Sequence, residues 1–451
     1  MEYSRLRRPL SSVDIINVRF VEDEDWDFRR ADTRYLTHGL HPYPARMVPQ
    51  VVGRLLERYA PKGCVVLDPF CGSGTVLVEA RLHGMNSVGI DINPLACLLA
   101  RVKSTPISPE KVRKAWASLK ATIGKEIGLL RFGQIDVDIP DFSGTNIDYW
   151  YKPTTMKELA IIRNHLKEIE DDEIRLFFDV PFSLTARNVS GTRKGEFKLF
   201  RMPEEEWKKY EPDVFGTFVK HVEDAIERME EFYKKCDRSV FSRVFMADTR
   251  KILTDDFPRE ANELLLENPP KIIVTSPPYG DSKTTVAYGQ FSRLSALWLD
   301  FEEGFDRRTI MAVDRLSLGG KAGWVLKLDL PTLHQTLEMI RKNDRPYKAR
   351  DKEVAAFFSD LYQCLENMHK VLDSGGYCCI VIANRTVRRV QIPTHAIIAE
   401  MGVKIGFEND ITIIPRNIPT KRLPWKNAPE NIPGLKGKTM SKENIIIMKK
   451  P

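Results

Sequence analysis

Short apolar runs recur along the chain, and each predicts a buried strand. They occupy residues 64–68, 87–92, 242–248, 271–274, 377–383, 411–414 and 444–448. Most are separated by segments whose apolar residues repeat with a helical period, at 51–59, 76–82, 215–233, 291–299, 351–372 and 393–401. This alternation predicts an α/β fold with a mostly parallel sheet. The last two runs are joined by a loop without a helix, so we expect them to form an antiparallel pair at the sheet edge.

Composition places the chain among soluble globular proteins. It has 451 residues, 42% hydrophobic and 29% charged, with a net charge of +7 that is compatible with a polyanionic partner. No apolar stretch reaches the length of a membrane span, and the N-terminus lacks an apolar signal core, so we expect a cytoplasmic protein. Seven scattered cysteines have no metal-binding spacing, which predicts reduced thiols and no metal. Only six glutamines among abundant Lys, Arg and Glu favour a thermophilic source.

The run at 64–68 leads into Asp68-Pro-Phe-Cys-Gly-Ser-Gly-Thr75 and then into a helix, which predicts a strand, a glycine loop and a helix. Glycines in such a loop let a ligand approach the backbone, and the free N–H groups of the helix N-terminus favour polar ligands. The next strand carries Asp91, 23 positions after Asp68, near the spacing at which Rossmann-type folds place a ribose-binding acid. The unit therefore predicts a nucleotide-type cofactor.

The loop differs from two common phosphate-binding patterns. It lacks the GKS/T of a P-loop, and Leu77 stands where a dinucleotide site has its third glycine. A cofactor without a pyrophosphate, such as S-adenosylmethionine, therefore fits better.

A second polar cluster follows the strand at 271–274. Two prolines in Thr275-Ser-Pro-Pro-Tyr-Gly280 end the strand abruptly and place acceptors beside an aromatic ring. Such a group suits an exocyclic amino group on a planar base. The alternative is a proline turn that only ends the strand.

Two basic segments are candidate nucleic-acid contacts. The first, Ala186–Gly195, includes Arg187, Arg193 and Lys194 and is followed by Phe197 and Phe200. The second lies in the loop Pro415–Lys442 and includes Lys421, Arg422 and Trp425. For each segment, a solvated loop is the alternative.

Together, Asp68-Pro-Phe-Cys-Gly-Ser-Gly-Thr75 and Ser276-Pro-Pro-Tyr279 resemble the two signature motifs of S-adenosylmethionine-dependent amino-methyltransferases. In that family the second motif begins with Asp, Asn or Ser, and Ser276 is more similar to the N4-cytosine members. His41-Pro-Tyr-Pro-Ala-Arg46 resembles the segment that lies against the methionine part of the cofactor. The resemblance covers residues 37–104 and 242–400, a little over half of the chain.

The resemblance implies a Rossmann-like, seven-stranded, mostly parallel sheet with one reversed strand, interrupted by an α-rich insertion. It implies that Asp91 holds the ribose, that Asp248 contacts the adenine amino group, and that the catalytic residues are Ser276, Pro277, Pro278 and Tyr279. Ser276 and the Pro277 carbonyl would accept hydrogen bonds from the amine, and Tyr279 would stack on the base. The full cofactor set is Tyr43, Pro44, Asp68, Pro69, Phe70, Gly72, Gly74, Thr75, Asp91, Asn93 and Asp248.

The same resemblance divides the chain into four parts. These are an N-terminal arm (1–37), the first half of the methyltransferase domain (38–104), an inserted substrate-recognition region (105–240), and the second half with the catalytic motif and the basic loop (241–451). The order of the motifs resembles one of the permuted classes of the family. Cys71 is interpreted as a small loop residue, because C5-cytosine methylation uses a Pro-Cys pair and the chain has none.

We therefore expect an enzyme that methylates N4 of cytosine in nucleic acid once or twice, and we favour structured RNA such as ribosomal RNA. The alternatives are a DNA N4-cytosine or N6-adenine modification enzyme, and a non-catalytic nucleic-acid-binding protein with the same fold.

Overall fold

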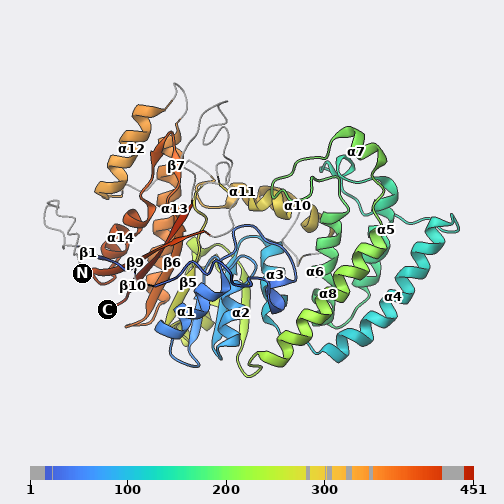
Figure 1. Cartoon of the computed structure of the whole chain (residues 1–451), viewed down its shortest axis with the longest axis horizontal. Coiled ribbons are helices and arrows are strands. Elements are labelled where there is room, and N and C mark those ends of the chain that lie inside the picture. The colour runs from blue at the N-terminus through green and yellow to red at the C-terminus, as the bar shows by residue number, and fades with distance from the viewer. Residues whose placement is uncertain are drawn as a thin grey trace.

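An eight-stranded sheet forms the centre of the structure (Figure 1). The computed structural model describes residues 16–22, 24–280, 285–299, 301, 307–320, 328–344, 349–418 and 441–451. The strand order is β1-β9-β10-β6-β5-β2-β3-β4. The strands are β1 (Asn17–Phe20), β2 (Val65–Asp68), β3 (Asn86–Asp91), β4 (Ser242–Met246), β5 (Ile272–Thr275), β6 (Tyr377–Ala383), β9 (Asp410–Asn417) and β10 (Lys442–Lys449).

The mostly parallel α/β sheet with one reversed strand is confirmed, but its strand count differs from the prediction. β10 runs antiparallel to both β6 and β9, and the other neighbouring pairs are parallel. The eighth strand, β1, comes from the N-terminal arm and pairs with β9, so the β9–β10 pair does not form the edge that we expected. β1 is only four residues long and three of them are exposed, which explains why the hydrophobic pattern missed it.

Helices cover both faces of the sheet because alternate strand residues point to opposite sides. On one face, Val66, Val274 and Ile445 pack with α1 (Pro49–Tyr59) and α2 (Thr75–Leu82). On the other face, Leu67 and Ile446 belong to a cluster that includes, among others, residues of three more helices. These are α9 (Arg259–Glu267), α13 (Arg350–Val371) and α14 (Thr394–Ile405).

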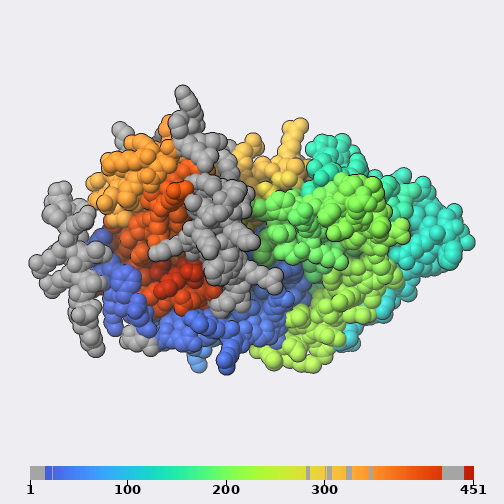
Figure 2. Space-filling model, turned by 45° about the horizontal axis from the view of Figure 1, so that its top comes forward, coloured from blue at the N-terminus to red at the C-terminus, as the bar shows by residue number. Residues whose placement is uncertain are grey.

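The chain between β3 and β4 is helical, as the α-rich insertion predicted. It contains α3 (Pro94–Ser104), α4 (Pro109–Arg131), α5 (Pro153–Lys167), α6 (Asp172–Asn188), α7 (Glu204–Lys209) and α8 (Val214–Lys235). Helices α4 to α8 stand beside the sheet and make up one side of the molecule, coloured cyan to green (Figure 2). The end of α3 lies close to the start of β4, since the Ser242 hydroxyl donates to that of Ser104 at 2.9 Å.

Three further helices and a small hairpin complete the described part of the chain. They are α10 (Tyr288–Trp298), α11 (Arg307–Leu316), α12 (Pro331–Asn343) and the pair β7 (Thr386–Val387) and β8 (Val390–Gln391). α10 packs with α3 and α6 in one apolar cluster. α11 approaches the centre of the molecule above the sheet (Figure 1).

The strand order reverses at β2. From β2 the chain moves outward to β3 and β4, and it then returns to place β5 on the other side of β2. In open α/β sheets, ligands bind in the crevice at the carboxyl ends of the strands at such a point. The fold therefore directs attention to the loops that follow β2 and β5.

Gly74 offers a test of the packing between the glycine loop and α3. Its φ is +83°, and a Cβ there would lie 2.7 Å from the Cα of Ala100. We expect Gly74→Ala to lower the free energy of unfolding by about 2–4 kcal/mol, since left-handed strain and a backbone clash combine. Gly63→Ala is the matched control, because Gly63 has φ +72° with open space around it. It should cost only about 1–2 kcal/mol in urea unfolding, and equal losses in the two variants would contradict the packing argument.

Candidate active site

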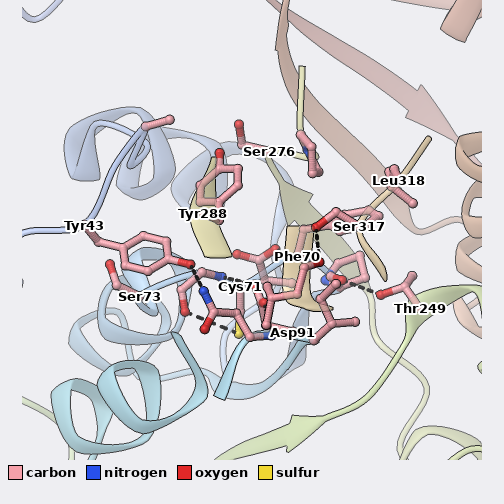
Figure 3. Close-up of a pocket in the computed structure, with 18 of the residues that line it drawn as sticks. Tyr43, Phe70, Cys71, Ser73, Asp91, Thr249, Ser276, Tyr288, Ser317 and Leu318 are labelled. Carbon is pink, nitrogen blue, oxygen red and sulfur yellow. Dashed lines mark hydrogen bonds between the residues drawn. The ribbon is translucent and has the colours of Figure 1, made fainter. Parts of the chain in front are cut away.

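A pocket of about 860 Å³, including its mouth open to solvent, lies at the carboxyl ends of β2, β3, β4 and β5. Its walls come from segments far apart in the sequence (Figure 3). All the predicted cofactor residues except Gly74 line it, together with Ser276 and Pro278 of the second motif. Gly74 instead caps α2 against α3. The structure thus brings the two motifs into one pocket, whereas their role as cofactor and catalytic residues remains a prediction.

The glycine loop presents backbone to this pocket. Gly72 has φ +48°, and its N–H donates to Asp91 Oδ2 at 2.9 Å, which ties the loop to the end of β3. A Cβ on Gly72 would lie 3.4 Å from the ring of Tyr43. A side chain here would therefore occupy the space between the loop and Tyr43, where a ligand has access to the backbone.

Asp91 is a preorganised acceptor at the pocket wall. Its Oδ1 accepts the N–H of Asn93 at 2.8 Å, while Oδ2 accepts that of Gly72. Burial raises the pKa of Asp91 to about 6. Above that pH the ionised carboxylate has spare lone pairs on both oxygens, so it can accept from two neighbouring hydroxyl groups. These features fit the ribose of S-adenosylmethionine.

Tyr43 is held in the wall by two elements. Asn93 Nδ2 donates to Tyr43 Oη at 3.0 Å and to Ser292 Oγ of α10 at 2.7 Å. The Tyr43 ring stacks on Tyr288, with ring centroids 5.9 Å apart, and Tyr288 also lines the pocket. Tyr288 was missed by the sequence analysis because an isolated tyrosine at the start of a helix carries no distinctive signal.

Two basic side chains support the segment that carries Tyr43. Lys103 Nζ donates to the His41 carbonyl at 3.2 Å, and Arg46 donates to the His38 carbonyl. Burial lowers the pKa of Lys103 well below its ordinary value. Both side chains act on carbonyl groups of the loop, so they fix the course of the backbone beside the pocket.

Asp248 lies at the pocket, but a neighbouring cation already engages its carboxylate. Arg250 Nε donates to Asp248 Oδ1 at 2.9 Å, and Arg250 Nη2 donates to Oδ2 at 2.7 Å. Arg250 also pairs with Asp360 and itself lines the pocket. The predicted contact of Asp248 with an adenine amino group would use the lone pairs that Arg250 leaves free.

A hydrogen bond joins the second motif to the first. Thr275 Oγ1 donates to Asp68 Oδ1 at 2.7 Å, which connects the ends of β5 and β2. Ser276 and Pro278 then face the pocket, whereas Pro277 is buried. Tyr279 lies beside them with its hydroxyl bonded to Glu443 of β10 at 2.8 Å. Glu443 had no signal in the sequence, because it lies 164 positions from Tyr279.

The predicted nucleic-acid contacts divide into three groups. Arg193 and Lys194 are exposed. Arg187 was wrong as a surface contact, because it is 8% exposed and donates to the carbonyls of Phe291 and Glu196. Lys421, Arg422 and Trp425 lie outside the described residues.

The thiol of Cys71 stays protonated at neutral pH. Burial raises the pKa of Cys71 well above its ordinary value. All seven cysteines are free.

Across the residues that the structure describes, no group of three His, Cys, Asp or Glu side chains could hold a metal ion. No helix among these residues is long and apolar enough to cross a membrane.

Asp68 yields a prediction about stability and pH. Burial raises its pKa to about 7, whereas an unfolded aspartate titrates near ~3.9. Between these values the folded protein keeps a proton that the unfolded chain has lost, so the resulting stability disappears as pH rises through about 7. We expect Asp68→Asn, which keeps an acceptor for Thr275, to be more stable than wild type at pH 8 by up to ~4 kcal/mol in urea unfolding.

The surface residue Asp373 is the matched control. Lys271 holds the pKa of Asp373 below its ordinary value, so Asp373→Asn should have the opposite sign and slightly destabilise the protein at pH 8. An Asp68→Asn protein less stable than wild type at pH 8 would contradict the assignment of a raised pKa to Asp68.

A family model described as DNA methylase matches residues 15–101. The chain is 37% identical over 434 residues to the Type II methyltransferase M.MvaI of Kocuria varians, covering 94% of this chain and 93% of that protein. It is 26% identical to the Type II methyltransferase M.MjaII of Methanocaldococcus jannaschii, over 56% of this chain and 62% of that protein.

A solved structure of the rRNA methyltransferase aviRa from Streptomyces viridochromogenes is also similar over 91% of this chain and 88% of its own. The identity is 10% and the TM-score is 0.29, so this similarity carries no argument about function. The similarity to M.MvaI, in contrast, extends over nearly the whole of both chains. The protein therefore belongs to the N4/N6 amino-methyltransferase family of nucleic-acid-modifying enzymes, a membership that implies S-adenosylmethionine as the methyl donor.

Proposed function

We propose that the protein methylates the exocyclic N4 amino group of cytosine in DNA. One observation carries this proposal: Ser276 and Pro278 line the same pocket as Asp91 and the glycine loop. An acceptor for an amino group thus lies beside the site that fits S-adenosylmethionine. A binding protein without catalysis would not need this juxtaposition.

The chemistry begins with a poor nucleophile, because the lone pair of an aromatic amine is delocalised into its ring. Hydrogen bonds from the amine to Ser276 Oγ and to the Pro277 carbonyl localise that lone pair on nitrogen. S-adenosylmethionine held beside Asp91 would supply a sulfonium methyl group, and its bond to sulfur would break as the nitrogen lone pair forms the new N–C bond. The contribution of the protein is to position the amine and exclude competing geometries.

The comparisons do not support our expectation of an RNA substrate. The matching family model is described as DNA methylase, and the relatives are named Type II methyltransferases. The expectation rested on dispersed basic and aromatic residues, a pattern that serves single-stranded nucleic acid of either kind. We therefore favour DNA. An amino group stacked inside a duplex cannot reach a pocket in the protein, so the target base must leave the helix.

The choice of cytosine over adenine rests on Ser276. A serine at the first position of the motif resembles the N4-cytosine members of the family, and this serine lines the pocket. N6 of adenine is the competing target, since both bases present an aromatic amine of the same chemistry.

We propose that the exposed hairpin 192–201 contacts the DNA backbone. Thr192 and Arg201 form a bridge, and Phe197 packs on Phe291 of α10 with ring centroids 5.8 Å apart. Phe291 in turn contacts Tyr43 at the pocket. The exposed side chains of Arg193 and Lys194 therefore lie on a segment that is docked near the site, where phosphate groups of a bound duplex would pass.

The reaction can be tested with methyl-labelled S-adenosylmethionine. We expect incubation with amplified genomic DNA to give N4-methylcytosine by nucleoside mass spectrometry, and incubation with total RNA to give none. Label in N6-methyladenine would overturn the cytosine assignment, and label in RNA alone would overturn the DNA assignment. Amplified DNA carries no prior modification, so every methyl group detected comes from the enzyme.

Replacement of Ser276 tests the catalytic role of its hydroxyl. We expect Ser276→Ala to lower kcat by about 10²- to 10³-fold, because a preorganised hydrogen-bond acceptor is lost. The Kd for S-adenosylmethionine, measured by calorimetry, should change by less than about threefold. Equal losses of cofactor binding and turnover would mean that Ser276 has a structural role.

The hairpin contact is tested by salt dependence. We expect Arg193→Ala/Lys194→Ala to weaken DNA binding and to reduce the slope of log K against log salt by up to about 2. Lys62→Ala/Lys235→Ala is the matched control, because it removes the same charge at exposed positions that precede β2 and β4, at the opposite end of the sheet. An equal reduction in both variants would show that net charge, and not this hairpin, determines the slope.

A further inference from the structure

A chain of hydrogen bonds leads away from Ser276 to a buried ion pair. Ser276 Oγ donates to Tyr279 Oη at 3.4 Å, and Tyr279 Oη donates to Glu443 Oε2 at 2.8 Å. The other oxygen of Glu443 accepts from Arg416. The chain therefore connects the candidate catalytic hydroxyl with a carboxylate on a strand that neither motif includes.

The ion pair lies inside the sheet. Glu443 is 8% exposed and stands opposite Arg416, which is 3% exposed, across the β9–β10 ladder. Arg416 also donates to the carbonyls of Trp26 at 2.8 Å and Asp27 at 3.2 Å. Since breaking a buried pair leaves an uncompensated charge, this position is fixed by the surrounding fold.

The hydrogen bonds of this series can run in only one direction, from Ser276 through Tyr279 to Glu443. An ionised carboxylate accepts hydrogen bonds and cannot donate, so Tyr279 must give its proton to Glu443. Tyr279 Oη is then left to accept, and Ser276 gives it the single hydroxyl proton that serine has. Burial, followed by the nearby Glu443 charge, raises the pKa of Tyr279 well above its ordinary value, so the phenol stays protonated and able to donate.

The consequence appears at Ser276. Its hydroxyl proton is directed towards Tyr279, so its lone pairs remain for the pocket. A serine without this arrangement could equally donate to a substrate, and it would then fail to draw electron density onto the amine. An aspartate in the same motif position would be an acceptor without help, whereas a neutral serine needs its direction set from outside.

We propose that Glu443 is a positioning residue for methyl transfer, which keeps Ser276 as a hydrogen-bond acceptor through Tyr279 and receives the proton that the amine loses. This inference rests on the proposed function of the pocket. It assigns to Tyr279 a role for its hydroxyl in addition to the ring stacking expected from the family resemblance.

The proton that the amine loses can leave along the same series of hydrogen bonds. Once the nitrogen has gained a methyl group, it carries one proton too many. That proton passes to Ser276 Oγ as the serine proton passes to Tyr279 Oη and the tyrosine proton passes to Glu443 Oε2. The two hydroxyl groups end unchanged, the product amine is neutral, and the carboxylate has become a carboxylic acid that later loses its proton to water.

Tyr279→Phe tests the chain while leaving the ring and the Arg416–Glu443 pair in place. We expect the rate constant of methyl transfer to DNA, measured in single-turnover assays and called kcat below, to fall about 10- to 100-fold. This is the loss expected for a hydrogen bond linked to a charged group. The Kd for S-adenosylmethionine and the melting temperature should remain close to wild type. Tyr377→Phe is the matched control, because Tyr377 lies at the opposite end of β6 from the site, and its kcat should not change.

A double-mutant cycle separates a relay from two independent effects. In the Ser276→Ala background the chain has lost its first member, so adding Tyr279→Phe should lower kcat by less than about twofold. Multiplicative losses, or a Tyr279→Phe enzyme with wild-type kcat, would overturn the proposal. Glu443→Gln provides a second route, because its amide can donate; provided that it folds, its kcat should fall as far as that of Tyr279→Phe.

The two proposals fail in different ways. If the wild-type enzyme transfers no methyl group to any nucleic acid, the proposed function is wrong before a variant is measured. If it is active and the cycle is multiplicative, the function stands and the role of Glu443 is wrong.

Discussion

The hydrogen bond from Thr275 to Asp68 joins the two segments on which the pocket depends. Thr275 ends β5 and Asp68 ends β2, and the residues that follow them form the motif and the glycine loop. The parallel pairing of β2 with β5 brings these segments together across 207 positions of sequence. The acceptor is a buried carboxylate, so the connection is made at an electrostatic cost that the surrounding packing must offset.

Carboxylates occur at several points of the site with different surroundings. Asp91 is held by backbone N–H groups, Asp248 by the guanidinium of Arg250, and Glu443 by Arg416. Their partners differ in how many lone pairs they leave free on the carboxylate. The same chemical group can therefore bind a ligand, support a neighbouring segment or orient a hydroxyl group. Such differences depend on neighbours that are distant in sequence.

Much of the fold could be predicted from local pattern. Buried runs such as Tyr377–Ala383 are apolar along their whole length, and the helix near Val214–Lys235 has a clear period, so both were recognised. The weakly apolar β1 was missed because its place depends on pairing with β9. Arg187 was misplaced because a basic residue in a basic segment looks exposed, whereas its buried guanidinium donates to the carbonyls of Phe291 and Glu196. Tyr288 and Glu443 join the site only through the packing of α10 and β10, which no local signal encodes.

The closeness of Ser104 and Ser242 has a consequence for how this enzyme can diversify. Because the chain leaves the sheet region and returns to it one hydrogen bond apart, the intervening helices could be lengthened, shortened or exchanged without moving β3 or β4. A replacement would need only a matching apolar face for α3 and α10, which share a core with α6. The sheet and its pocket can thus stay constant, while the helical segment that carries the proposed DNA contacts varies in length and sequence between the ends of α3 and β4.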